Sequence, residues 1–353
     1  NQSGLIETVG SGEPRIDFQG NTKGALLLEP QRSNIITYSN DFTNSGWSHF
    51  RGTITSNSII SPDGTLNASI YQEDSQTGSH LFRRQSLSIT NGLSYTGSIF
   101  AKKGELTSIR LLSNSSSRWV ASASFDLENG TVTSGNGVIE NYGNGWYRCS
   151  ISGNAVQTTS DAGLEMYTSV GIGRNGEGLY MYGAQFEQGS YATSYIPTSG
   201  SAVTRVKDVC NQTPPSGVIG QTEGVMYFKT NSLLPSGTRT IALAYTSGSS
   251  YYQIYFTSSN QIRVDVNGSL LVITNAINLN ILNKIAFAYK SGDNALYING
   301  VLVASSGNAT VPSSLNDFYL GNSLGNEQSG SYQDFKLYNT RLSNAELQAL
   351  TTI

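Results

Sequence analysis

GALLLEPQRSNIITYSNDFTNSGW, residues 24–47, is the stretch from which the fold of the chain can best be deduced. A dense apolar run, Ala25–Leu28, is followed by a corner at Glu29–Arg32 and by a second β-prone run at Ile35–Tyr38. Proline fixes φ and removes a backbone donor, so Pro30 favours a turn between two extended segments. The stretch predicts the first strand of a β-sandwich, with a corner from which the chain continues into a core.

The composition of the whole chain agrees with an all-β protein. Charged residues make up 13% of the 353 residues, about half the usual share. Gly, Ser, Thr and Asn are abundant, but aromatic and aliphatic residues recur throughout, which argues against disorder. The net charge of −3 argues against a nucleic-acid or anionic-membrane partner. Because no apolar run reaches the roughly 18 residues of a spanning helix, we expect no membrane insertion.

Turn signals separate the β-like runs between Ser33 and Pro197. Asn-Gly tolerates positive φ at both central positions of a type I′ hairpin turn. No apolar period of 3.6 residues persists for two turns in this region, so we expect an antiparallel sandwich. The Asn-Gly pairs that predict hairpins are Asn91–Gly92, Asn129–Gly130, Asn136–Gly137, Asn144–Gly145 and Asn175–Gly176.

The fold class predicted is therefore all-β, with two tandem antiparallel β-sandwich (jelly-roll) domains and one short C-terminal helix. Residues 1–31 are expected to form an extended N-terminal arm and the opening strand. Residues 32–198 form the first jelly roll, residues 199–220 a Pro- and Gly-rich linker, and residues 221–353 the second jelly roll. Ser343 and Glu346 form a capping box at the start of the helix.

Alternation in the second domain predicts strand registers. Apolar residues meet across each hairpin only in one register, and turns are expected at Asn267–Gly268 and Asn299–Gly300. The predicted pairs are Phe256–Ile262, Ile254–Val264, Tyr255–Arg263, Val264–Leu271, Ile262–Ile273, Ile298–Val301 and Leu296–Val303.

Two family resemblances can be identified from these segments. In the second domain, KIAFAYKSGDNALYINGVLVASS (284–306), FYLGN (318–322) and GSYQDFKLYNTRLSNAELQAL (330–350) resemble the closing half of a laminin-G-like, concanavalin A-like jelly roll. In the first domain, segments 4–18, 26–47, 144–151 and 182–208 resemble the carbohydrate-binding-type jelly roll of tailed-bacteriophage fibre, spike and other virion proteins. The motifs EPQRSN and SYIPT…AVTR carry the second resemblance.

The bacteriophage resemblance implies a function and a location. It implies a non-enzymatic virion structural protein, in a tail fibre, spike or capsid appendage, that mediates adhesion to host-surface or environmental glycans. It also implies other virion proteins as partners, a homo-oligomer that is a trimer by analogy, and a chain that is one segment of a longer fibre protein or a short version of one. The alternatives are a polysaccharide-active jelly-roll enzyme with an attached binding module, and a purely structural capsid-decoration protein.

Three side chains in the first domain are candidates for carbohydrate binding. A sugar ring stacks well on an indole, so Trp119 and Trp146 are considered, with Arg148 on the same strand face as Trp146. Tryptophan in a sandwich is more often part of the core, and that alternative stays open.

The second domain offers a candidate face of aromatic, amide, guanidinium and carboxylate groups. Alternation places them together on the outward side of two neighbouring strands. Leu270 and Val272 are expected on the same face, which favours an interface with the first domain or a neighbouring subunit, and plain surface is a further alternative. Its members are Tyr251, Gln253, Tyr255, Arg263 and Asp265.

Other polar residues receive structural interpretations. Glu29 and Arg32 are expected to form a latch that closes the corner around Pro30. Cys149 and Cys210 are expected to be buried free thiols. We expect no cofactor, with a structural calcium ion as a possibility whose ligands would be Asp41, Asp126 and Asp334.

No catalytic residue can be assigned from the sequence. There is no Gly-x-Ser-x-Gly elbow, the two histidines His49 and His80 lie apart, and no run of carboxylates has glycosidase spacing. The Gly-rich segment 171–178 precedes no helix that would hold a phosphate.

Overall fold

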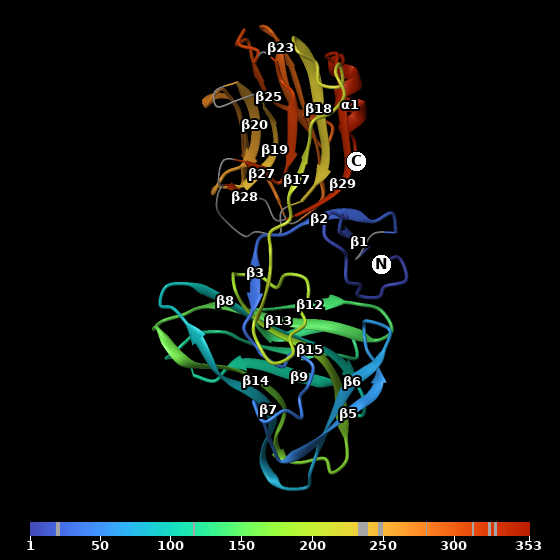
Figure 1. The fold of residues 1–353 in the computed structure, drawn as a ribbon, viewed down its shortest axis with the longest axis vertical. Helices are drawn as coiled ribbons and strands as arrows, with labels where there is room; N and C mark the ends of the chain where they lie inside the picture. The colour runs from blue at the N-terminus through green and yellow to red at the C-terminus, as the bar shows by residue number, and fades with distance from the viewer. Residues whose placement is uncertain are drawn as a thin grey trace. The chain divides into compact units, whose positions relative to one another are not determined.

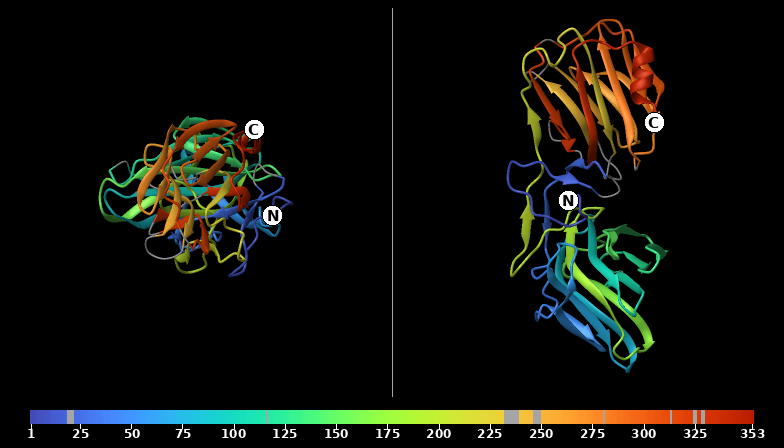
Figure 2. Two further views of the ribbon diagram at one scale, coloured as in Figure 1. Left: turned by 90° about the horizontal axis from the view of Figure 1, so that it is seen from above. Right: turned by 90° about the vertical axis from the view of Figure 1, so that its right-hand side faces the viewer.

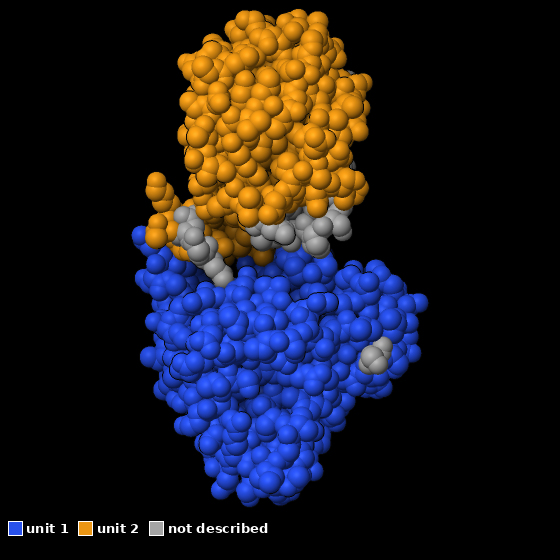
Figure 3. Space-filling model, turned by 180° about the vertical axis from the view of Figure 1, so that it is seen from behind, with its two compact units in different colours: residues 1–8, 31–206 blue, residues 9–30, 207–353 orange. Residues whose placement is uncertain are grey.

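The computed structural model describes residues 1–18, 22–115, 117–231, 239–245, 250–279, 281–312, 314–323, 326–327 and 330–353. Within these ranges the chain is all-β apart from one C-terminal helix, as predicted. It divides into two compact units, which Figure 3 colours separately: unit 1 holds residues 1–8 and 31–206, and unit 2 holds residues 9–30 and 207–353. None of the helical structure in the described ranges has the length and apolarity that a membrane span needs.

Unit 1 consists of two antiparallel sheets that face each other (Figures 1 and 2). One sheet has the order β11 (Thr131–Gly135), β10 (Ser122–Asp126), β9 (Ser108–Ser113), β14 (Thr159–Ile172), β7 (Thr77–Ile89) and β4 (Trp47–Phe50). The other has the order β12 (Gly137–Asn141), β13 (Trp146–Asn154), β8 (Ser94–Lys103), β15 (Gly178–Gln188), β6 (Leu66–Glu73) and β5 (Gly52–Ile60). A separate pair joins β3 (Arg32–Asn34) to β16 (Val203–Arg205).

Aromatic rings fill the core between these sheets. Phe42, Trp47 and Phe82 form one cluster, with ring centroids 4.9 Å apart for Phe42–Trp47 and 6.0 Å apart for Phe42–Phe82. Asn34, fully buried, ties the chain to this core: its amide donates to the carbonyls of Ala184 and Ile196, and its Oδ1 accepts from two backbone N–H groups. A fully satisfied buried amide fixes the path of the chain where β3 ends.

The Asn-Gly pairs of unit 1 do not all form the predicted hairpin turns. Only Asn144–Gly145 has positive φ at both residues, 49° and 77°. Gly92, Gly130 and Gly176 alone take positive φ in their pairs, and Gly137 begins β12. The dipeptide permits the type I′ geometry but does not impose it when the flanking strands need another connection.

Unit 2 is a second sandwich (Figure 1). One sheet has the order β1 (Ile16–Asp17), β2 (Ala25–Leu28), β29 (Gly330–Tyr338), β18 (Glu223–Thr230), β23 (Asn283–Lys290), β24 (Asn294–Ile298) and β25 (Val301–Ser306). The other has the order β17 (Cys210–Gln212), β26 (Asp317–Leu320), β19 (Arg239–Tyr245), β20 (Tyr251–Phe256), β21 (Gln261–Val266) and β22 (Ser269–Ala276). A short hairpin joins β27 (Asn322–Ser323) to β28 (Asn326–Glu327).

The helix α1 (Asn344–Thr351) packs outside the first of these sheets. The predicted capping box is present, since Ser343 accepts from the Glu346 N–H and Glu346 accepts from the Ser343 N–H. Fully buried Leu347 packs on Tyr227 and Ala288 of the sheet. A helix of two turns is marginal alone, so this docking stabilises it.

The predicted registers hold up to the first bulge. The hairpin β20–β21 pairs Tyr255 with Arg263 and its apolar neighbours as predicted. Beyond it, a bulge between Val264 and Asp265 places Val264 opposite Val272, so the predicted Val264–Leu271 pair is wrong.

Bulges also make two other predicted pairs wrong, one in this hairpin and one in the last hairpin. Arg263, and not Ile262, lies opposite Ile273. In the last hairpin Ile298 pairs with Val301 as predicted, but a bulge after Leu296 places that residue opposite Ala304. An extra residue shifts pairing by one, and alternation alone does not mark where it occurs.

The predicted domain boundaries are wrong at the corner. Ala25–Leu28 was expected to open the first sandwich, but β2 pairs with β29 of unit 2, and Leu28 belongs to the unit 2 core. Three of its four residues are buried, so the strand has no exposed face that would identify its partner sheet. The predicted linker 199–220 also contains strands, because β16 pairs within unit 1 and β17 within unit 2.

Candidate functional site

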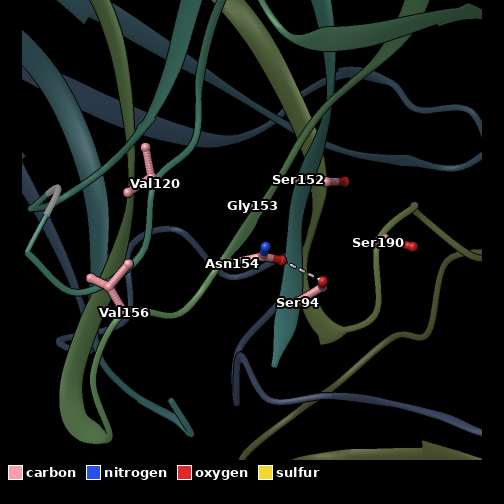
Figure 4. A pocket seen from close by; sticks show the side chains of 7 residues that line it. All are labelled: Ser94, Val120, Ser152, Gly153, Asn154, Val156 and Ser190. Atoms are coloured by element: carbon pink, nitrogen blue, oxygen red, sulfur yellow. Dashed lines mark hydrogen bonds between the residues drawn. The ribbon is translucent and has the colours of Figure 1, made fainter. Parts of the chain in front are cut away.

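A shallow cleft of about 400 Å³ opens in unit 1 where three strands of one sheet end or begin. Strand β8 begins there, β13 ends there, and Ser190, which follows the end of β15, contributes to the lining. Figure 4 shows two valines on one side of the cleft and two serines on the other. The cleft is lined by Ser94, Val120, Ser152, Gly153, Asn154, Val156 and Ser190.

Local hydrogen bonds fix the polar wall of the cleft. Ser94 and Asn154 are cross-strand partners, and the Ser94 hydroxyl donates to Oδ1 of Asn154 at 2.6 Å (Figure 4). The Ser152 hydroxyl is hydrogen-bonded to that of Thr96 at 2.7 Å. Gly153 is needed for close approach, because a Cβ there would lie 2.0 Å from the carbonyl oxygen of Val120.

The opposite wall is aliphatic. Val120 and Val156 are 56% and 49% exposed, and none of the lining side chains is charged. A cleft with hydroxyl and amide groups on one side and methyl groups on the other suits a neutral ligand with both C–H and hydroxyl surfaces.

Trp119 does not present its ring to this cleft, and the stacking prediction for it is wrong. The residue is fully buried, its indole N–H donates to the Gly163 carbonyl at 3.1 Å, and its ring packs against Phe186 with centroids 5.0 Å apart. The sequence found the right region but the wrong residue, since the next residue, Val120, lines the cleft.

Trp146 and Arg148 are also interior residues, each 2% exposed, so stacking and ligand contact there are wrong as well. They do share a strand face, as predicted, but a second small core covers that face. The indole of Trp146 donates to the Ile60 carbonyl. Arg148 donates to the Ser98 hydroxyl and lies over the Phe100 ring at 5.3 Å. A strand face opposite the main core is therefore not an exposed face in this unit.

In unit 2 the structure brings together three members of the predicted polar face. Tyr255 donates to Oδ2 of Asp265 at 3.0 Å, Arg263 donates to Oδ1 of the same carboxylate at 2.5 Å, and the guanidinium lies 5.7 Å from the Tyr255 ring centroid. Burial and the hydrogen bond to Asp265 raise the pKa of Tyr255 to about 12, so its hydroxyl stays a donor at neutral pH. This array is rigid and polar.

The other members of the face are less available. Gln253 is buried and donates to the Thr240 hydroxyl at 3.1 Å, whereas Tyr251 is half-buried. Leu270 is 49% exposed beside them. Val272 was expected on this face, but the bulge in β21–β22 turns it into the core. The face therefore presents one carboxylate, that of Asp265, already held by Tyr255 and Arg263.

Glu29 and Arg32 do not form the predicted latch with each other. Glu29 pairs with Arg15 at 2.6 Å, and Arg15 also pairs with Asp208 at 2.7 Å, all within unit 2. Arg32 belongs to unit 1, where its Nε lies 3.8 Å from the buried carboxylate of Glu187. Glu29 and Arg32 are therefore each held by partners within their own unit, and not by each other.

The three aspartates considered for calcium lie apart. Asp41 accepts from Thr43, Asp126 from Asn129, and Asp334 pairs with Lys336. Among the described residues, no group of three or more His, Cys, Asp or Glu side chains could hold a metal ion. The calcium ion stays a prediction without an assigned site.

The two cysteines are free, as expected. Cys149 is buried, and burial raises the pKa of its thiol. Cys210 is only half-buried, which the prediction of two buried thiols did not anticipate.

Comparison with known proteins relates part of unit 2 to a family. The profile of the concanavalin A-like lectin/glucanases superfamily matches residues 226–348, from within β18 to within α1. No curated protein sequence matches the chain.

Similar solved structures are distant. The carbohydrate-binding module CBM40 of the Ruminococcus gnavus IT-sialidase, bound to α2,3-sialyllactose, is 16% identical with a TM-score of 0.34 over 37% of this chain and 84% of that one. The SAP-like pentraxin of Limulus polyphemus is 14% identical with a TM-score of 0.31, over 36% and 69%. The binding domain of botulinum neurotoxin DC, in complex with rat synaptotagmin II, is 15% identical with a TM-score of 0.31, over 38% and 36%.

Values this low say nothing about a ligand for this chain. The sequence segments quoted above already indicate a concanavalin A-like domain, and the profile match agrees with them independently. Residues 226–348, which contribute strands to both antiparallel sheets of unit 2, are therefore similar to the concanavalin A-like lectin/glucanases superfamily.

Proposed function

We propose that this protein is a non-enzymatic adhesion protein of a tailed-bacteriophage virion and that it binds neutral glycans through the cleft of unit 1. The observation that carries the proposal is the uncharged, two-sided lining of that cleft, with Ser94, Ser152 and Asn154 opposite Val120 and Val156.

The chemistry of the lining matches a sugar ring. A pyranose presents hydroxyl groups around its edge and C–H groups on its faces, so it can hydrogen-bond to one wall and contact methyl groups on the other. The Ser94–Asn154 hydrogen bond holds the amide in place before a ligand arrives, which lowers the ordering cost of binding. A shallow, open site of this kind supports weak binding, which repeated copies on a virion would strengthen through avidity.

The non-enzymatic part of the proposal rests on the absence of acid–base groups in the cleft. Glycoside hydrolysis needs two carboxyl groups on either side of the scissile bond. The residues that line the unit 1 cleft include no carboxylate. The alternative of a polysaccharide-active enzyme would require such a pair elsewhere on the molecule.

The virion setting rests on the sequence. The QRSN part of EPQRSN and the segment SYIPT…AVTR, which resemble phage fibre and spike proteins, lie together in unit 1, because β3 pairs with β16 and the Asn34 amide donates to the Ile196 carbonyl. Partnership with other virion proteins, a homotrimeric assembly and a place in a tail fibre, spike or capsid appendage are parts of this proposal. A purely structural decoration protein would share the fold but leave the cleft empty.

A glycan array with the full chain tests the adhesion role. We expect binding to neutral oligosaccharides that falls at least tenfold in Asn154→Ala and in Val156→Ser. Asn175→Ala, which changes an exposed turn of the same unit, is the matched control. Tyr255→Ala tests whether the polar face of unit 2, and not the cleft of unit 1, binds the glycan.

The proposal fails if the chain binds no neutral glycan. It also fails if Asn154→Ala and Val156→Ser bind as well as the unchanged chain. Loss of binding only in Tyr255→Ala would move the site to unit 2.

A further inference from the structure

A second cleft lies wholly within unit 2, and its chemistry is the opposite of the first. Helix α1 covers part of the outer face of the sheet that contains β29, β18 and β23, and beside it a cleft of about 640 Å³ remains. Thr22 and Lys23, which precede β2, contribute to its wall. Its charged and amide groups are Lys23, Lys229, Lys284, Lys336, Asp334 and Gln333.

Strand pairing explains how the lysines gather. Lys229 on β18 lies directly opposite Lys284 on β23, and Asp334 on β29 is its partner on the other side. Lys336 lies two residues further along β29 on the same face, since side chains alternate along a strand. The cleft therefore contains four ammonium groups and one carboxylate in a chain whose net charge is −3.

Only part of this charge is compensated within the protein. Lys336 pairs with Asp334 at 2.7 Å and lies 5.1 Å from the Tyr227 ring centroid, and Lys284 donates to the Thr352 carbonyl at 2.6 Å. The Lys229 side chain forms no ion pair or hydrogen bond with any residue in the described ranges. Like charges directly opposite on neighbouring strands are destabilising, so a directly opposed lysine pair indicates a site that an anion would complete.

We propose that this cleft binds an acidic saccharide, with a sugar carboxylate between Lys229 and Lys284 and sugar hydroxyls on Asp334 and Gln333. The carboxylate of Asp334 accepts hydrogen bonds from hydroxyl groups but repels a second anionic group. This favours a ligand with one carboxylate and several hydroxyls over a phosphate-rich polymer. The site lies in the other unit from the neutral cleft and does not depend on it.

Titration calorimetry of the full chain tests the proposal with three probes. They are an oligogalacturonate, its methyl-esterified form, which keeps the sugar and removes the charge, and inorganic phosphate. We expect the acid form to bind at least tenfold more tightly than the ester, with an affinity that falls as salt is added. Phosphate at the same concentration is expected to give no saturable heat.

Variants assign the binding to the cleft. Lys229→Gln and Lys284→Gln should each weaken oligogalacturonate binding at least fivefold. Lys290→Gln removes the same charge from β23 outside the cleft and should change the affinity less than twofold. Asn154→Ala, in the unit 1 cleft, should leave this binding unchanged.

Three results would overturn the proposal. They are equal binding of the acid and its ester, undiminished binding in the folded Lys229→Gln and Lys284→Gln variants, and phosphate binding as tight as that of the oligogalacturonate. The last would show a general anion site. Thermal melting of each variant confirms that it is folded.

Discussion

The two units use the same kind of scaffold for clefts of opposite chemistry. In unit 1 the cleft lies at strand ends, and its polar groups are neutral, with Ser94 already hydrogen-bonded to Asn154. In unit 2 the cleft lies on an outer sheet face, where cross-strand pairing sets Lys229 between Lys284 and Asp334, and the Lys229 side chain forms no ion pair with a described residue. The sandwich fold by itself therefore does not determine which ligand is bound. The residues at its strand ends and on its outer faces do.

The buried carboxylate of Glu187 in unit 1 has a structural role. The Glu187 carboxylate is fully buried and accepts from the Gln185 side chain and from both the N–H and the hydroxyl of Thr193. Such a satisfied buried carboxylate rigidifies the chain around it and is not free to bind a ligand. The buried charge of unit 1 is thus structural, whereas the lysine cluster of unit 2 faces the solvent.

The largest expected effect tests whether the residues before and after the corner stabilise different units. Leu28 lies in the core of unit 2 and Ile36, eight residues later, in the core of unit 1. Leu28→Ala and Ile36→Ala should each destabilise one unit by about 2–5 kcal/mol. All three tryptophans, Trp47, Trp119 and Trp146, belong to unit 1, so urea unfolding followed by tryptophan fluorescence reports on that unit alone.

Ile36→Ala should therefore shift the tryptophan transition, while Leu28→Ala should leave it in place. Hydrogen exchange of β18 and β29 should show the reverse. A tryptophan transition that moves equally in both variants would contradict the assignment of residues 9–30 to unit 2.

This corner also shows how much of the fold can be predicted from the sequence. The apolar run Ala25–Leu28 predicts a strand, and a strand forms there. Its partner sheet depends on β29, which lies some three hundred residues later, and nothing local distinguishes the two sandwiches. The β20–β21 register followed from alternation because one face is buried. The predicted β21–β22 register failed at the bulge after Val264, where an extra residue breaks the period.

The candidate sites were predictable only in part. Tyr255, Arg263 and Asp265 were placed together because cross-strand neighbours follow from register. The burial of Trp119 could not be deduced, since its ring is covered by residues from other strands. The lysine cluster needs the β18–β23 pairing, which joins segments about fifty residues apart. Two lysines in separate strand-like runs carry no signal until that register is known.

A smaller effect concerns acid stability in unit 1. Burial of Asp63 opposes its ionisation, but hydrogen bonds from Thr65, Asn67 and Ser61 outweigh this and lower its pKa to about 2 from an ordinary value of 3.8. Because the pKa of Asp63 is lower in the folded than in the unfolded state, the ionised carboxylate stabilises the fold at pH values above the unfolded-state pKa. This stabilisation is lost as pH falls from about 4 to about 2. Allowing for partial exposure, we expect Asp63→Asn to cost about 1 kcal/mol at pH 7.

The difference between Asp63→Asn and the unchanged chain should shrink towards pH 2, as measured by tryptophan fluorescence in urea. Asp161→Asn, which removes an exposed carboxylate paired with Arg118, is the control and should show little change. A pH-independent loss of stability in Asp63→Asn would show that the side chain acts by shape and not by charge.

The smallest expected effect lies in unit 2, on one pair of strands that carries both kinds of charge pair. Strands β18 and β23 join Glu223 to Lys290 at one end and Lys229 to Lys284 at the other. The first pair is an ion pair of 3.0 Å, and the second brings like charges together. Without ligand, Lys229→Gln should therefore stabilise unit 2 by about 0.2–1 kcal/mol, whereas Lys290→Gln should destabilise it slightly, because it breaks an exposed ion pair.

Hydrogen exchange of β18 and β23, with and without 0.5 M salt, measures both changes. Salt should reduce each of them, because the side chains are partly exposed and their interactions are screened. A variant that is more stable but binds an acidic saccharide less well would show that Lys229 is retained at a cost to the fold, as expected of a binding residue. If Lys229→Gln lowered stability as Lys290→Gln does, the lysine pair would already be compensated within the protein, and the electrostatic reason for an anion in this cleft would be lost.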